Sequence, residues 1–224
     1  MSIKENLISI KNTFINPSCQ LIAVSKTKSK EEIMEAYNAG IRDFGENKVQ
    51  EITEKYEILP KDIRWHMIGH LQRNKVKYLA PFVYLIHGVD SLKLLSEINK
   101  QAEKNNRKIP CLLQVHIALE DSKFGFSEDE LIALLESEEI KTLGHVQVIG
   151  LMGMATFTDN DAQIKSEFEG LKNLFTQLQS SSLPENIEMK ELSIGMSGDY
   201  LLAQEAGSTM VRIGTAIFGE RNYN

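Results

Sequence analysis

One stretch near the start of the chain decides its fold, Leu21-Ile22-Ala23-Val24-Ser25-Lys26-Thr27-Lys28-Ser29-Lys30-Glu31-Glu32. The apolar run at residues 21–25 has the length of a buried strand. Ser29, followed three residues later by Glu32, is a capping-box signature for the start of a helix. The stretch therefore predicts a buried strand that leads, through a short loop carrying Lys26, into a helix.

The same order of strand and helix continues along the chain. Besides residues 21–25, strands are expected at residues 41–44, 64–68, 83–87, 111–117, 146–152, 191–194 and 209–213. Helices are expected at residues 3–13, 30–38, 48–56, 74–79, 92–103, 128–137, 161–179 and 200–206. Strands that alternate with helices predict a parallel sheet covered by those helices.

Eight strand–helix units in 224 residues suit a single (β/α)8 TIM barrel, which makes residues 1–224 one domain. An open, doubly wound sheet is the alternative with the same order of elements. Only a short segment follows Ile213, and it leaves little room for a last covering helix. We therefore expect the N-terminal helix at residues 3–13 to pack outside the barrel in that place.

Composition narrows the classes of protein. A net charge of -6 argues against a general nucleic-acid binder, because such proteins need basic surfaces. No apolar stretch is long enough for a membrane helix, and the first residues lack the apolar core of a signal peptide. Cys19 and Cys111 show no CxxC or zinc-type spacing, so reduced thiols are expected. These features predict a cytoplasmic protein with no membrane or nucleic-acid partner.

Lys26 is the first candidate for chemistry, because it follows a predicted strand at the end where barrel proteins keep their active sites. A partly desolvated amine there has a lowered pKa and can condense with an aldehyde to form a Schiff base. The alternative is a strand-end lysine whose amine reaches into solvent.

The segments after the last two predicted strands are typical of a phosphate site. Gly195, Ser197 and Gly198 form one turn, Gly214-Thr215 form another, and each turn leads from a strand into a helix start. Ordinary turn glycines are the alternative. Arg212 lies inside the last apolar strand, where a buried guanidinium needs partners. Those partners are either a structural carboxylate or an acceptor on a ligand.

Together, these strand-end segments resemble the pyridoxal 5′-phosphate homeostasis protein family. The matching motifs run through nearly the whole chain: Ala23-Val24-Ser25-Lys26, Phe44-Gly45-Glu46-Asn47 with Gln50-Glu51, Trp65-His66-Met67-Ile68-Gly69 with Leu71-Gln72 and Asn74-Lys75, Gly150-Leu151-Met152, Leu192-Ser193-Ile194-Gly195-Met196-Ser197 with Asp199, and Val211-Arg212-Ile213-Gly214 with Ile217-Phe218-Gly219. The resemblance implies the barrel of fold type III pyridoxal phosphate enzymes, like that of the N-terminal domain of alanine racemase.

The resemblance also implies a bound pyridoxal 5′-phosphate (PLP). Lys26 matches the lysine that holds PLP as a Schiff base, and Arg212 matches the arginine that faces the pyridine nitrogen. The other matched positions cradle the phosphate or lie beside it and the ring: Ser197, Gly214, Thr215, Met196 and Asn47.

Two residues depart from the family pattern. Ile194 replaces a methionine that is common there. His70 stands where many bacterial members have proline, which leaves its role open.

The implied function is PLP homeostasis, in which the protein buffers or delivers the cofactor, with apo PLP-dependent enzymes as possible recipients and a monomer as the expected state. A non-catalytic protein is expected, because an arginine at the pyridine nitrogen opposes protonation of the ring and weakens it as an electron sink. A racemase also needs a second acid–base group, and Tyr200 and Tyr223 could only be improvised substitutes for it. A PLP-dependent amino-acid racemase or lyase is the alternative.

Two further hypotheses come from the residues alone. A metal-dependent barrel hydrolase could use His66, His70, His87 and His116, although no HExxH or carboxylate-rich pattern accompanies them, and no metal site is expected. Lys123 could serve cofactor transfer or a second PLP site, or it could be a solvated loop lysine.

Overall fold

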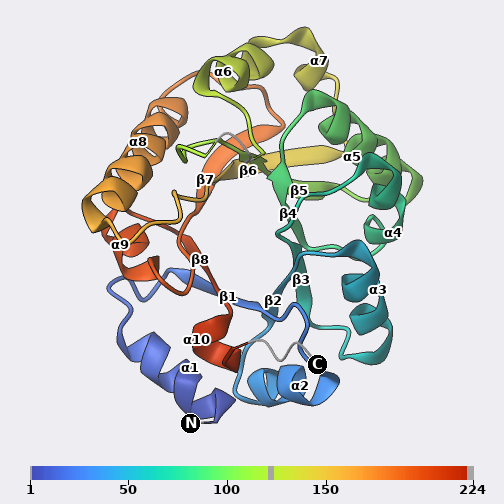
Figure 1. Cartoon of the computed structure of the whole chain (residues 1–224). Helices are drawn as coiled ribbons and strands as arrows, with labels where there is room; N and C mark the ends of the chain where they lie inside the picture. The colour runs from blue at the N-terminus through green and yellow to red at the C-terminus, as the bar shows by residue number, and fades with distance from the viewer. Residues whose placement is uncertain (1, 121–123, 221–224) are drawn as a thin grey trace.

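In the computed structural model, which describes residues 2–120 and 124–220, eight parallel strands close into one barrel (Figure 1). The strands are β1 Gln20–Val24, β2 Asp43–Glu46, β3 Arg64–Met67, β4 Leu85–Val89, β5 Ile109–Gln114, β6 Val146–Met152, β7 Ile187–Ser193 and β8 Met210–Ile213. Closure comes from β8, which pairs with both β7 and β1. The predicted (β/α)8 barrel is confirmed, and the open doubly wound sheet is wrong.

Helices form a ring outside the strands (Figure 1). They are α1 Ile3–Asn12, α2 Lys30–Asn38, α3 Val49–Ile58, η1 Arg73–Lys75, α4 Val76–Leu79, α5 Leu92–Lys104, α6 Glu128–Glu136, α7 Glu138–Lys141, α8 Asp161–Gln179, α9 Tyr200–Glu205 and α10 Thr215–Phe218. The capping box at Ser29 and Glu32 is present and starts α2 as predicted. The short helix α7 was not predicted, because four residues carry no readable apolar period, whereas α10 begins at the Gly214-Thr215 turn, where a helix start was expected.

Strand β7 is longer than the four residues predicted for it. Ile187 and Met189 are buried, whereas Glu188 and Lys190 between them are exposed. This apolar–charged alternation is the pattern of a strand with one solvated side, and the prediction missed it by looking for a continuous apolar run.

The N-terminal helix completes the outer ring, as predicted. Helix α1 lies outside strand β1 of the barrel, beside α10 and α2 (Figure 1). The Asn6 side-chain amide donates to the carbonyl of Ile217 in α10 at 2.8 Å. Because α10 has only one turn, α1 covers barrel surface that a full eighth helix would otherwise bury.

Two further features are the hydropathy of the helices and the state of the two cysteines. No helix in the described parts of the chain is long and apolar enough to cross a membrane. Cys19 and Cys111 are both buried and unpaired, and burial raises the pKa of the Cys19 thiol to about 11.

Leu7→Ala tests the covering role of α1. Leu7 is 2% exposed, and its truncation should lower the free energy of unfolding by about 3 kcal/mol, because it leaves a cavity between α1 and the barrel. Ile8→Ala is the matched control, since Ile8 on the same helix is 53% exposed and should change stability by less than about 0.5 kcal/mol. Urea denaturation measures both, and equal effects would contradict this packing.

Candidate functional site

The site residues predicted from the sequence follow neighbouring strands of the barrel. Lys26 comes after β1, Asn47 after β2, and Ser197 after β7, while Arg212 lies within β8. In the closed barrel these strands stand in the order β7, β8, β1, β2. Parallel strands present their carboxyl ends at one mouth, so the fold brings the four positions to one sector of that mouth.

Lys26 is half-buried in the loop between β1 and α2. Its neighbour Ser25 is fully buried and points outward, since its hydroxyl donates to Glu46 Oε1 at 2.6 Å. Successive residues of a strand alternate between the two sides. Lys26 follows Ser25 in the turn after β1, at the mouth of the barrel.

A buried ion cluster behind β1 holds the backbone on either side of Lys26. Lys55 Nζ in α3 donates to the Ser25 carbonyl at 2.8 Å, to Glu46 Oε1 at 2.8 Å and to Glu51 Oε1 at 2.7 Å. Glu51 in turn accepts from the backbone N–H of Thr27. The residues before and after Lys26 are thus both tied to Lys55 and its carboxylates.

This cluster also holds a strained turn. Thr27 has φ of 65°, a left-handed conformation that a β-branched residue rarely adopts. Such strain persists only where surrounding contacts fix it, and it is common beside functional groups. The contact from Glu51 to the Thr27 amide supplies that restraint directly after Lys26.

Glu46 is the least typical group of the cluster. It is fully buried, and its Oε2 atom has no hydrogen-bond partner in the described structure. Burial raises the pKa of its carboxyl to about 7, although Lys55 and Ser25 oppose the rise. Glu46 therefore changes charge near neutral pH, behind the loop that carries Lys26.

The predicted phosphate turns meet each other. The Ser197 hydroxyl accepts from the backbone N–H of Gly214 at 3.1 Å and from that of Ala216 at 3.5 Å. Thr215 between them is exposed at the first position of α10. Met196 is 38% exposed beside Ser197. The Ser197 hydroxyl accepts these two bonds and keeps its own hydrogen to donate, and the exposed Thr215 hydroxyl is a second donor, so the two turns offer hydroxyl donors that suit a phosphate.

Two glycines allow this approach of chain segments. Gly195 has φ of +94°, and a Cβ atom there would lie 2.5 Å from Cβ of Ala203. A Cβ atom at Gly214 would lie 3.3 Å from Val24. A side chain at Gly195 would push its turn away from α9, and one at Gly214 would crowd Val24 of β1.

The loop of Lys26 is tied to the same turns. Lys28 Nζ donates to the carbonyl of Phe218, the last residue of α10, at 3.0 Å and pairs with Glu32 at 3.2 Å. The lysine loop and the phosphate-type turns are therefore one connected unit.

Arg212 is buried and points into the barrel. Its Nη1 donates to the carbonyl and the hydroxyl of Ser193 at 2.7 and 2.6 Å, and its Nη2 donates to the carbonyl of Gly153 at 3.0 Å. Burial lowers the pKa of Arg212 to about 10, against an opposing influence of Asp199, so the guanidinium stays charged at neutral pH. Of the two kinds of partner considered for Arg212, the structural carboxylate does not occur among the described residues, and the acceptors that the structure gives are neutral oxygens.

Asn47 lies half-buried on the rim formed by β2 and β3. A Cβ atom at Gly69 would come within 2.6 Å of the Asn47 carbonyl oxygen, so this rim is closely packed. The structure thus places Asn47 one strand away from Lys26, on the side opposite β8.

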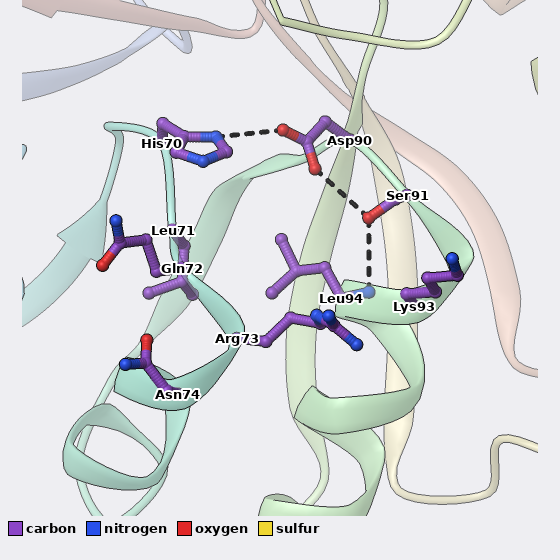
Figure 2. Close-up of a pocket in the computed structure, with 9 residues that line it drawn as sticks. All are labelled: His70, Leu71, Gln72, Arg73, Asn74, Asp90, Ser91, Lys93 and Leu94. Carbon is purple, nitrogen blue, oxygen red and sulfur yellow. Dashed lines mark hydrogen bonds and ion pairs between the residues drawn. The ribbon is translucent and has the colours of Figure 1, made fainter.

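His70 follows β3 and contacts residues that follow β4 and β5. Its Nδ1 is 3.0 Å from Asp90 Oδ2, and its ring stacks on Phe124 at 4.0 Å. A cavity of about 530 Å³ opens here between η1 and the start of α5, with Arg73 and Lys93 beside it (Figure 2). His70 therefore borders an open cavity between η1 and the start of α5.

The other histidines do not form the arrangement that the hydrolase hypothesis needs. His66 Nδ1 faces His87 Nε2 at 2.9 Å, and His116 Nε2 faces the Glu120 carbonyl at 3.0 Å. Within residues 2–120 and 124–220, no three His, Cys, Asp or Glu side chains are grouped to hold a metal ion.

Three residues of the sequence hypotheses remain. The hydroxyl of Tyr200 is 2.7 Å from Thr13 Oγ1, and its ring packs on Phe14, so Tyr200 faces the end of α1. Lys123 and Tyr223 lie outside the described residues.

Sequence reasoning missed Lys55, although a signal was present. Val49, Ile52 and Lys55 follow one another at a spacing of three on the buried face of α3. A lysine on the apolar face of a helix needs a buried partner, and Glu46 and Glu51 in the preceding motif could have supplied it.

Comparison with known proteins gives close relatives. Residues 1–222 match the family model of the alanine racemase N-terminal domain. The pyridoxal phosphate homeostasis protein of Aquifex aeolicus is 42% identical over 205 residues, which cover 91% of this chain and 88% of the relative.

Solved structures agree with the fold. PipY of Synechococcus elongatus superposes with a TM-score of 0.89 without PLP, at 37% identity, and of 0.86 with PLP bound, at 35% identity; both alignments cover 97% of this chain and 100% of PipY. The alanine racemase of Bartonella henselae shares the fold at a TM-score of 0.75 and 16% identity, over 97% of this chain and 58% of the racemase.

Glu46→Gln tests the buried cluster through pH. Because the folded protein raises the pKa of Glu46 to about 7 from 4.5, the folded state binds more protons than the unfolded state between these values. The free energy of unfolding contributed by Glu46 must therefore fall as pH rises through that window and level off above it.

The variant cannot ionise and should lack this fall. The difference in unfolding free energy, wild type minus Glu46→Gln, should decrease from acidic to neutral pH, as measured by urea denaturation at each pH. Taking the difference cancels the titration of the buried histidines, which both proteins share. Parallel pH profiles would show that Glu46 has an ordinary pKa.

Proposed function

Because the chain belongs to the pyridoxal phosphate homeostasis protein family, whose barrel is that of the alanine racemase N-terminal domain, we propose that it binds PLP and buffers or delivers this cofactor. The observation that carries the proposal is the convergence of an amine, a buried guanidinium and a phosphate-type donor set at one sector of the barrel mouth. The PLP-bound state of the similar PipY supports it.

The chemistry of the donor set fits PLP group by group. Lys26 would hold the aldehyde carbon as a Schiff base, with release of one water. Ser197, Gly214 and Thr215 would hold the phosphate, with Met196 beside them. Arg212 would face the pyridine nitrogen, and Asn47 would lie beside the ring. PLP itself supplies an aldehyde and an electron-accepting ring.

Two observations support a holder over an enzyme. Arg212 is a lasting cation, and a cation opposes protonation of a ring nitrogen that it faces, which weakens the ring as an electron sink. Tyr200 is the tyrosine within the described residues that was considered as a second acid–base group. Its hydroxyl is hydrogen-bonded to the hydroxyl of Thr13, at the end of α1. The shared barrel fold of amino-acid racemases keeps a racemase or lyase as the second candidate.

The wider setting is part of the same proposal. We assign the chain as one barrel domain that acts as a monomer in the cytoplasm and passes PLP to apo PLP-dependent enzymes. Two buried, unpaired thiols support a reducing compartment.

Lys26→Ala tests the attachment. Wild-type protein with PLP should absorb in the visible range, and borohydride should fix one pyridoxyl phosphate group on the peptide containing Lys26. Lys26→Ala should lose both signals. Lys30→Ala, an exposed lysine at the start of α2, is the matched control and should keep them. If the wild type shows no visible band with PLP, the protein does not hold the cofactor in this way.

A second pair of assays divides the holder from the enzyme. Wild-type protein loaded with PLP should restore activity to an apo PLP-dependent enzyme and should leave L-amino acids unracemised in deuterated water. Incorporation of deuterium at Cα that is lost in Lys26→Ala and kept in Lys30→Ala would favour the racemase.

A further inference from the structure

A chain of buried polar side chains crosses the interior of the barrel and ends at Arg212. Asp43 Oδ1 lies 3.1 Å from His66 Nε2, and His66 Nδ1 lies 2.9 Å from His87 Nε2. His87 Nδ1 lies 3.0 Å from Ser193 Oγ, which accepts from Arg212 Nη1 at 2.6 Å. His66, His87 and Ser193 are fully buried. The links come from β2, β3, β4, β7 and β8, so the chain joins strands from both sides of the barrel.

The far end of the chain is an anion. Arg64 Nε donates to Asp43 Oδ1 at 2.6 Å, and Arg64 Nη2 pairs with Oδ2. Burial by itself would raise the pKa of the Asp43 carboxyl, but the hydrogen bonds from Arg64 and His66 outweigh it and hold that pKa below its ordinary value. Asp43 is therefore ionised at neutral pH and only accepts hydrogen bonds.

An ionised Asp43 fixes every proton in the chain. His66 Nε2 must carry a hydrogen in order to donate to the carboxylate. If His66 is neutral, its Nδ1 is an acceptor and takes the hydrogen of His87 Nε2. The remaining acceptor, His87 Nδ1, takes the hydroxyl hydrogen of Ser193. All donors then point from Arg212 toward Asp43.

Neutral imidazoles fit their surroundings. Burial lowers the pKa of His66, and Asp43 only partly offsets this. Burial lowers the pKa of His87 well below its ordinary value, and the charge of Arg212 lowers it further. A protonated His87 would place a second buried cation two hydrogen bonds from Arg212.

The chain of hydrogen bonds is important for Arg212 because the guanidinium has no anionic partner within the described residues. Among residues 2–120 and 124–220, no carboxylate lies within ion-pair distance of it, and its three hydrogen-bond acceptors are neutral oxygens. A row of aligned hydrogen bonds that ends in an anion turns a lone pair of Ser193 toward the guanidinium. It also prevents the Ser193 hydroxyl from rotating and presenting its hydrogen instead.

We propose that Asp43, His66 and His87 are positioning residues that act through Ser193 to fix the orientation and charge of the Arg212 guanidinium toward the ring of bound PLP. This inference rests on the proposed function. It extends the site from the barrel mouth through the interior to the opposite end, where Asp43 and Arg64 border a cavity of about 440 Å³.

The first measurement needs no cofactor. Long-range ¹H–¹⁵N spectra of the wild-type protein, labelled at histidine and free of PLP, should show two histidines that stay neutral across the neutral pH range with the proton on Nε2. His66→Gln and His87→Gln assign these signals. A charged imidazole or an Nδ1–H form at either position would overturn the proposed direction of the hydrogen bonds.

The second measurement uses PLP-loaded protein. Asp43→Asn keeps an acceptor for His66 and removes the charge. It should shift the visible absorption maximum of bound PLP and weaken PLP binding by about tenfold, the size typical of second-layer network changes. His87→Phe breaks the chain and should shift the maximum in the same direction by more, whereas His87→Gln, which keeps a donor and an acceptor, should recover part of the loss.

Asp62→Asn is the matched control, because Asp62 also pairs with an arginine, Arg42 at 3.0 Å, but lies exposed outside the barrel. It should leave the maximum and the affinity unchanged. Wild-type protein that bound no PLP would overturn the proposed function together with this role. Wild-type binding with an unchanged maximum and affinity in Asp43→Asn would overturn this role alone, and Asp43→Asn keeps that test open even if His87→Phe does not fold.

Discussion

The pairing of β8 with β1 is the constraint on which the site depends. Residues Gln20 to Ala23 run in register with Met210 to Ile213, so the first and last strands of the sheet become neighbours. This closure brings β1, the strand that leads to Lys26, beside the strand of Arg212, with Ile22 opposite Arg212 and Val24 against Gly214. Helix α1 then covers the outside of the barrel beside the one-turn helix α10. The closure of the barrel, its covering by α1 and the grouping of the site residues all depend on the pairing of β8 with β1.

Charged groups are buried on both sides of the paired strands β8 and β1, and each depends on specific partners. Outside β1, Lys55 joins Glu46, Glu51 and the Ser25 carbonyl, and the backbone around Lys26 is held by that cluster. Inside the barrel, Arg212 is held by Ser193 and Gly153. A buried charge is costly unless its hydrogen bonds are satisfied, so such clusters fix the positions of the groups they contain. One cluster orients the loop of the amine, and the other orients the guanidinium.

The sequence predicted what local patterns determine. Continuous apolar runs predicted β1 and β6, and a capping box predicted α2, because strand burial and helix starts depend on neighbouring residues. The sequence left the partners of Arg212 open, and Lys55 and the chain through His66 and His87 were missed. Lys55 had a signal in the sequence, its place on the apolar face of α3 near Glu46 and Glu51. The contacts of Ser193 with Arg212 and His87 join separate strands, and nothing local to Ser193 or His87 indicates which side chain faces it across the barrel. Whether the predicted site residues bind PLP stays a prediction.

The most direct test of the account is a crystal structure of this chain soaked with PLP. The account predicts continuous density from Lys26 Nζ to the cofactor, the phosphate at Ser197, Gly214 and Thr215, and the guanidinium of Arg212 facing the ring nitrogen. Cofactor bound instead in the cavity bordered by His70, Arg73 and Lys93, with the barrel mouth empty, would contradict it.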